Sequence, residues 1–247
     1  MSIPADHPRY RSLCVREKLA QAMRDGIVAP EGLSAHGRGE AFDYLLGEVT
    51  IPSAKCAEQC AAALFHVAKH PVISVNGNTA VLAANEIAAL QKATGALVEV
   101  GLFHRTEKRI RLITDLLTAA GVVVFEGEAE RLLPLSHDRA FCLANGIYKA
   151  DLVLVPLEDG DRAQALVELG KKVITIDLNP LSRTSRCATL PIIDEVTRAL
   201  PEIAAYASSM RFEEAASILA DIPEQNWFLQ AALDTISQRL NSTLSTI

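Results

Sequence analysis

The sequence lacks the features that mark membrane, secreted or nucleic-acid-binding proteins. It contains no run of about 18 uncharged apolar residues, the span of a membrane helix, and its N-terminus has no basic region followed by an apolar run. The formal net charge is −6, whereas a surface that follows nucleic acid normally carries a basic excess. The 5 cysteines are odd in number and lack disulfide-framework spacing, which suits a reducing compartment. We therefore expect a cytoplasmic protein that binds small molecules or proteins, with no membrane or nucleic-acid partner.

Two common cofactor-binding fingerprints are also missing. The chain has neither the glycine-rich dinucleotide motif nor a Walker-type phosphate loop with its lysine. The first absence counts against a nicotinamide-dependent oxidoreductase, which a Rossmann-like pattern alone would allow. Cys56 and Cys60 lie four residues apart, but two further metal ligands are not nearby. We expect these cysteines to pack structurally, and metal ligands stay unassigned.

The chain does contain short apolar strands that alternate with helices. Its 247 residues, 49% of them hydrophobic, can bury a sizeable core. Near-continuous apolar strands between helices predict an α/β fold, a three-layer Rossmann-like sandwich with a mainly parallel sheet. We expect one domain (1–247), with a helical N-terminal part (1–70), a core (71–194) and C-terminal helices (195–247) that break near Pro201 and Pro223. The expected helices are 9–25, 53–69, 79–95, 106–121 and 162–170, and the expected strands are 71–77, 96–103, 122–127, 150–161, 171–179 and 189–194.

Ligands of open parallel sheets bind where strands end and loops enter helices, a rule that selects residues 75–80, 102–108, 156–162 and 177–186. Asn76 and Asn78 supply amide donors and acceptors around a glycine, although a tight turn with an Asn N-cap would look the same. Asp177 could accept a ribose hydroxyl, and Arg183 with Arg186 could hold phosphate oxygens; a solvated polar loop is the alternative.

Two further groups of polar residues suit anion or metal chemistry. Glu158, Asp159 and Asp161 could hold Mg²⁺ or accept protons, but Asp and Gly also form ordinary turns. The stretch LSAHGRGEAFDYLLGE (33–48) places glycines on both sides of Arg38, and we expect a loop just ahead of a helix. In that loop Arg38 would be the cation for an anion and His36 a donor or base. These patterns indicate an α/β enzyme that handles polyanions.

Taken in order, these stretches resemble the archaeal 4-phosphopantoate–β-alanine ligase family, also called phosphopantothenate synthetase. The matching segments are 3–13, 15–19, 36–48, 72–78, 145–186 and the Ile-Asp of LPIID, which together reach from the start to about residue 200. The resemblance implies ligation of 4-phosphopantoate to β-alanine in coenzyme A biosynthesis, with ATP as co-substrate, Mg²⁺, release of AMP and diphosphate, and a phosphopantoyl-adenylate intermediate. It also implies a homodimer, to which helices 9–25 and 53–69 could add the interface. A non-catalytic ATP-sensing protein is the alternative, because it would share the phosphate-binding loops.

The resemblance also assigns residues to ATP. The implied contacts are Arg16, Arg38, Asp177, Leu178, Asn179, Arg183, Thr184, Glu195 and Val196. The family usually has serine where this chain has Thr184, and often Asn-Ile where it has Glu195-Val196. Beyond the resemblance, our hypothesis is that Arg38 and Arg183 stabilise phosphates, and that Asn76 and Asn78 position the pantoyl acid. Glu158 or His36 would take a proton from the β-alanine ammonium. Arg105 or Lys108 would hold the 4-phosphate, although either could equally be a solvated charge at the start of a helix.

Overall fold

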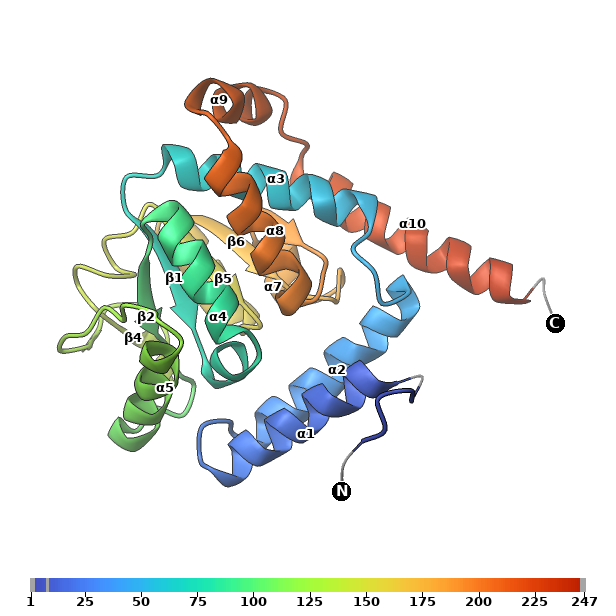
Figure 1. Ribbon diagram of the computed structural model, residues 1–247. Coiled ribbons are helices and arrows are strands. Elements are labelled where there is room, and N and C mark those ends of the chain that lie inside the picture. Colours follow the sequence, from blue (N-terminus) through green and yellow to red (C-terminus); the bar gives the residue numbers. More distant parts are fainter. Residues whose placement is uncertain (1–2, 8, 245–247) are drawn as a thin grey trace.

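A computed structural model describes residues 3–7 and 9–244 of the chain (Figure 1). Residues 1–2, 8 and 245–247 lie outside the described part, including the last three of the expected C-terminal helical segment. The main sheet has five parallel strands in the order β2-β1-β5-β6-β7. Their bounds are β1 (Pro71–Val75), β2 (Leu97–Val100), β5 (Leu152–Pro156), β6 (Lys172–Ile176) and β7 (Leu190–Ile192). The expected mainly parallel α/β fold is confirmed.

The strand order reverses beside β1, because the chain runs from β1 to β2 on one side and returns to β5 on the other. Such a reversal leaves a crevice at the carboxyl ends of the strands, since the connecting loops diverge there. The helix after each strand therefore begins at this edge. Those helices are α4 (Gly77–Thr94), α5 (Glu107–Ala119), α6 (Gly160–Glu168), α7 (Arg183–Cys187) and α8 (Val196–Ser209).

Both faces of the sheet are buried, which explains why its strands are apolar throughout. Successive side chains of a strand point to opposite faces. Ile73, Leu154 and Ile174 join the cluster that contains α3 (Pro52–Val67), α4 and α8. Val153 and Val173 join a second cluster with α6 and the segment 132–150. The sheet is thus the middle layer of three (Figure 1).

The remaining elements surround this sandwich. α1 (Tyr10–Arg24) and α2 (Pro30–Leu46) form a pair below the sheet in Figure 1, and α9 (Phe212–Ala220) and α10 (Gln225–Leu244) follow α8. A small antiparallel pair, β3 (Glu130–Arg131) and β4 (Phe141–Cys142), and the 3₁₀ turn η1 (Asp138–Ala140) lie in a segment for which the sequence predicted no element. In the described residues, no helix is both long and apolar enough to cross a bilayer.

Two expected features of the secondary structure are wrong: the strand 122–127 and the helix break near Pro201. The strand 122–127 is reduced to one bridge, in which Val124 pairs with Val98 at the outer edge of β2. Pro201 does not break α8; the helix continues through it, because buried neighbours such as Leu200 and Ile203 pack on the core and offset the hydrogen bond that proline removes. The expected break near Pro223 is confirmed, since it separates α9 from α10.

The apolar residues of α3 are buried inside the chain. Ala57, Ala61, Leu64 and Phe65 are at most 4% exposed, and α3 packs against α8 and α9. These side chains are therefore not available to a second protomer. Of the two helices expected to add an interface, only α1 keeps most of its surface open.

Candidate functional site

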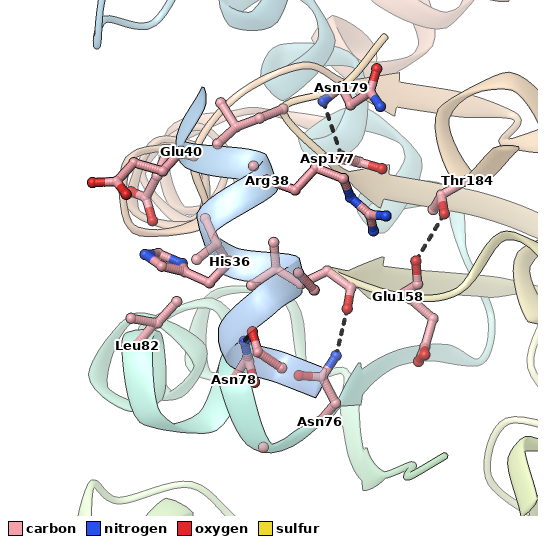
Figure 2. A pocket seen from close by; sticks show the side chains of 18 of the residues that line it. His36, Arg38, Glu40, Asn76, Asn78, Leu82, Glu158, Asp177, Asn179 and Thr184 are labelled. Atoms are coloured by element: carbon pink, nitrogen blue, oxygen red, sulfur yellow. Dashed lines mark hydrogen bonds between the residues drawn. The ribbon is translucent and has the colours of Figure 1, made fainter. Parts of the chain in front are cut away.

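A pocket of about 690 Å³ lies at the carboxyl edge of the sheet. Pockets for small ligands usually measure roughly 300–1,000 Å³, so this one has room for more than a single small molecule. Residues that follow all five strands line it, and α2 crosses its opening as a separate wall (Figure 2). Each of the four loops selected from the sequence contributes residues to this pocket.

The expected loop around His36-Gly37-Arg38-Gly39 is wrong, because the stretch lies inside α2. Pro30 starts this helix, and Gly47 ends it in the left-handed conformation with a φ of 97°. Only Gly32 serves close packing, because a Cβ there would collide with the side chain of Asn78, whose Nδ2 donates to the Gly32 carbonyl at 2.8 Å; Gly37 has open space around it. Amides in the middle of a helix are already hydrogen-bonded, so an anion here meets side chains rather than backbone.

Arg38 extends from α2 into the pocket toward Asp177 (Figure 2). Its guanidinium makes no ion pair or hydrogen bond with any residue of the described segments. Burial raises the pKa of Asp177, and the charge of Arg38 opposes that rise. An uncompensated cation that faces a pocket is suited to an anionic ligand.

His36 and Arg38 are not brought together. They project from opposite sides of α2, since two residues correspond to about 200° of helix rotation (Figure 2). His36 shares its side with Glu40, which Arg16 holds through two hydrogen bonds of 2.9 and 2.5 Å. Burial lowers the pKa of His36, Glu40 opposes this shift, and Arg16 adds to it, so the imidazole is neutral near pH 7. Arg16 itself does not line the pocket, whereas Glu40 does.

The loop after β6 is a rigid turn built around Asp177. Its carboxylate accepts the Asn179 amide at 3.0 Å and the Ser182 hydroxyl at 2.5 Å, and the Ser182 hydroxyl in turn caps α7. Leu178 is buried in an apolar cluster, so it offers a ligand mainly backbone. The loop thus presents Asp177 and Asn179 to the pocket in a fixed geometry.

Arg183 and Thr184 differ in what they offer. Arg183 is exposed, and its Nε and Nη2 both contact Gln164 Oε1, at 3.2 and 2.7 Å. The hydroxyl of Thr184 is buried and donates to the Glu158 carbonyl at 2.8 Å (Figure 2). The hydroxyl therefore joins two loops, and serine at this position could make the same bond.

Asn76 confirms the N-cap interpretation. Its Oδ1 accepts the Thr79 amide at 3.0 Å, and its Nδ2 donates to the carbonyls of Pro156 and Leu157 at 3.2 and 2.9 Å. The side chain thereby joins the β1 and β5 loops, and both of its amide hydrogens are used. Its predicted role in positioning an acid has no support in this geometry. Asn78 also lines the pocket, and its Oδ1 accepts no hydrogen bond from the residues that the structure describes.

Glu158 is the shared partner of two arginines. Its carboxylate, only 1% exposed, pairs with Arg139 and, at 3.1 Å, with Arg162. The preceding Leu157 adopts the left-handed conformation with a φ of 51°, which is unusual for a residue with a branched side chain. Both carboxylate oxygens of Glu158 are therefore engaged by guanidinium groups within the protein.

The two residues that differ from the usual family pattern occupy the start of α8. Glu195 caps its own helix by accepting the Thr197 amide at 2.9 Å, and burial raises the pKa of its carboxyl. Val196 is 1% exposed. Both line the pocket, and a contact from Val196 to a ligand would come from backbone.

Four pocket arginines were missed by the sequence analysis: Arg11, Arg109, Arg139 and Arg198. Arg11 lies in the matching segment 3–13, and Arg109 follows the selected loop 102–108 by one residue; no motif pointed to the other two. Arg105 and Lys108, the predicted phosphate ligands, do not line the pocket. Nor do the residues that the structure describes contain a group of three or more His, Cys, Asp or Glu side chains arranged for a metal ion.

The fold and the pocket define a doubly wound α/β protein with an arginine-rich binding site at the switch point of its sheet. The chain belongs to the phosphopantothenate/pantothenate synthetase family, whose model matches residues 53–239. It is 59% identical to the 4-phosphopantoate–β-alanine ligase of Methanospirillum hungatei, over 98% of this chain and 99% of the relative. Relatives of the same name from Methanosarcina mazei and Thermococcus kodakarensis are 54% and 50% identical, each over 85% of this chain and 84% and 82% of their own length.

Proposed function

We propose that this protein joins 4-phosphopantoate to β-alanine with consumption of ATP, forming 4′-phosphopantothenate, AMP and diphosphate in coenzyme A biosynthesis. The observation that carries the proposal is the combination of near full-length similarity to ligases with a pocket in which Arg38 forms no ion pair or hydrogen bond with the residues that the structure describes. Ligands with several phosphates need such cations. The non-catalytic alternative has no observation in its favour, because the relatives are named as enzymes.

In the proposed first step, the pantoyl carboxylate attacks the α-phosphorus of ATP and diphosphate leaves. Both reactants are anions, so the step requires cations that neutralise the phosphates as negative charge moves to the leaving group. We assign Arg38 and Arg183 to this task, and the fixed turn at Asp177 and Asn179 to the nucleoside. Because the turn is already ordered, holding the reactants in line costs little further entropy.

In the proposed second step, the amine of β-alanine attacks the acyl carbon and AMP leaves. The amine must first lose a proton, and His36 is neutral near pH 7 while Glu158 is engaged by two arginines. We therefore assign the proton acceptor to His36 rather than Glu158. His36 lies on the far side of α2 from Arg38, so its role is tested separately from that of Arg38.

The reaction needs a divalent cation to offset the charge of the triphosphate. Mg²⁺ usually binds through one or two protein carboxylates together with substrate phosphates. Asp159 fits this requirement, because it lines the pocket and its side chain is 51% exposed. Asp159 has one ion pair, with Arg139 Nε at 3.3 Å, whereas Glu158 pairs with two arginines and Asp161 lies against His137 at 2.6 Å.

The test is release of AMP and diphosphate by the purified protein given ATP, Mg²⁺, 4-phosphopantoate and β-alanine, with each component omitted in turn. AMP formation that requires both organic substrates supports the ligase and its adenylate. Formation of ADP instead would retain the ligase but replace the adenylate with an acyl phosphate. Binding of ATP without turnover under any combination would overturn the proposal in favour of an ATP sensor.

Two further parts of the proposal concern assembly and location. We infer a cytoplasmic homodimer, as the family resemblance implies. Exposed apolar side chains, among them Tyr44, Phe212 and Trp227, provide surface for an interface outside α3. Light scattering of the purified chain tests the dimer, and a monomer at micromolar concentration would contradict it.

A further inference from the structure

The pocket has a second end that the proposed nucleotide contacts do not use. Those contacts follow β6 and β7 or come from α1, α2 and α7. The ends of β1 and β2, on the other side of the switch point, carry a separate set of pocket residues that includes Gly77, His104 and Arg109, joined by Arg139 from η1. β1 and β6 are two strands apart in the sheet, which corresponds to roughly 10 Å.

Arg109 is fixed in place but keeps its charge uncompensated. Its Nε and Nη2 donate to the Ile27 carbonyl at 3.3 and 3.1 Å, and its Nη1 donates to the His104 carbonyl at 2.9 Å. Within residues 3–7 and 9–244 it has no carboxylate at ion-pair distance. A guanidinium has five N–H groups, so two remain for a ligand.

Arg139 is nearly buried, with a side chain 7% exposed, and one of its nitrogens is unused. Its Nε donates to Asp159 at 3.3 Å, and its Nη1 contacts Glu158 and donates to the Gly101 carbonyl at 3.2 Å. Its Nη2 donates no hydrogen bond to any described residue. That atom keeps some contact with solvent, and Arg139 is one of the residues that line the pocket.

The charges of the two guanidiniums act on each other. Burial lowers the pKa of Arg109, the charge of Arg139 lowers it further, and Glu31 opposes these shifts. Gly77 lets Arg109 and the Ile27 carbonyl lie close to the loop after β1, because a Cβ there would lie 2.5 Å from the Ile27 oxygen and 3.3 Å from Arg109 Nη2. An anion that binds between two fixed cations stabilises both of them.

We propose that Arg109 and Arg139 form the binding site for the phosphate monoester of the acyl substrate, and that they make the protein selective for the phosphorylated acid. This inference rests on the proposed ligase function. An acid with a carboxylate at one end of a short carbon chain and a phosphate at the other would lie across β1 and β5, with the carboxylate toward Arg38. Arg105 and Lys108 are thereby replaced as phosphate ligands.

The test begins with the unaltered protein. Steady-state kinetics with 4-phosphopantoate and with pantoate should give kcat/KM values that differ by at least about 100-fold, because pantoate leaves both cations without a partner. Inorganic phosphate should inhibit competitively against 4-phosphopantoate. If the protein uses no acid at all, the proposed function fails; if it uses pantoate as well as the phosphorylated acid, the function stands and this site is wrong.

Variants then assign the selectivity to residues. Arg109→Gln should raise KM for 4-phosphopantoate at least about 30-fold, change KM for ATP and β-alanine less than about threefold, and abolish phosphate inhibition. Arg111→Gln is the matched control, since Arg111 lies on the same helix with its side chain 78% exposed. Arg139→Lys keeps a charge beside Glu158 and should give a smaller rise in the same KM. Thermal unfolding of each variant separates these effects from a loss of folded protein.

Two results would overturn the assignment while leaving the ligase intact. One is an increase in KM for ATP, rather than for the acid, in Arg109→Gln, which would place the triphosphate at this end of the pocket. The other is normal KM for the acid in Arg109→Gln together with a raised KM in Arg105→Gln, which would return the phosphate to the residue outside the pocket.

Discussion

Arg198 of α8 donates to Asp43 of α2 at 2.6 Å, although 155 residues separate them in the chain. The same guanidinium donates to Asp194 at 2.6 Å, and although burial opposes its charge, these carboxylates raise the pKa of Arg198. This pair fastens the end of α2 to the core, while the Asn78 contact to Gly32 fastens its beginning.

Asp43→Asn should therefore loosen α2. The pair is largely buried, with side chains 14% and 13% exposed, and removal of one partner of a buried pair costs about 3–5 kcal/mol. We expect a loss of about 2–4 kcal/mol in the free energy of unfolding by urea, reduced because Asp194 still pairs with Arg198 and some solvent remains. Glu107→Gln, which removes an exposed pair with Arg111, should cost less than about 0.5 kcal/mol. Equal losses in the two variants would contradict the role of Asp43.

Arg38→Ala should abolish most activity without affecting stability. Arg38 is exposed and forms no ion pair or hydrogen bond with the described residues, so folding loses little when it is removed. Loss of one positioned cation at a developing negative charge typically costs about 100- to 1,000-fold in rate. Exchange of labelled diphosphate into ATP, measured with 4-phosphopantoate alone, should fall by that factor. Normal turnover at saturating ATP would show that the assignment of Arg38 is wrong.

His36→Gln should affect the second half of the reaction. If the neutral imidazole accepts the amine proton, the variant should retain diphosphate exchange and lose about 100-fold in amide formation. The wild-type rate should also fall as pH drops through the lowered pKa of His36, and the variant should lack that limb. A matched loss in both half-reactions would instead place His36 with the nucleotide.

Glu58→Gln should stabilise the protein at neutral and alkaline pH. The Glu58 carboxyl is fully buried, both oxygens lack hydrogen-bond partners among the described residues, and burial together with Asp194 raises its pKa to about 9. The unfolded chain loses this proton near 4.5 and the folded chain near 9, so wild-type stability falls as pH rises between these values.

Because glutamine does not titrate, the difference in the free energy of unfolding between variant and wild type should be small at pH 5 and exceed about 1 kcal/mol at pH 8. Urea unfolding of both proteins across this range measures it. Parallel pH profiles would show that the carboxyl does not keep its proton on folding.

The sequence predicted those parts of the fold that local patterns determine. The strand at 71–77 and the helix that ends at Gly95 were found because apolar runs and a terminal glycine are local signals, and Gly95 does adopt the left-handed conformation. The stretch 36–39 was misread for the opposite reason. Its glycines looked like loop residues, but the stretch lies inside a helix that begins at Pro30, and among the glycines of that helix only Gly32, beside Asn78, lacks room for a Cβ.

The site was predictable as a region but not as a set of contacts. The edge rule located the loops that hold Asp177 and Glu158. It could not show that Glu158 is held by Arg139 and Arg162, because that depends on how a segment without regular periodicity folds back over the sheet. The catalytic assignments of Arg38, Arg183 and His36 stay predictions until activity is measured.

The left-handed backbone of Leu157 affects which substitutions the protein tolerates at this position. A left-handed backbone costs a residue with a Cβ about 1–2 kcal/mol, and glycine would remove that cost. Yet the carbonyl of Leu157 receives the Asn76 amide, and the turn directs Glu158 between its arginines. A laboratory selection for heat resistance would still not gain from Leu157→Gly, because the Leu157 side chain packs against the main core cluster and its loss would offset the relief of strain. Core packing and the arrangement of the pocket thus favour the same residue at this one position.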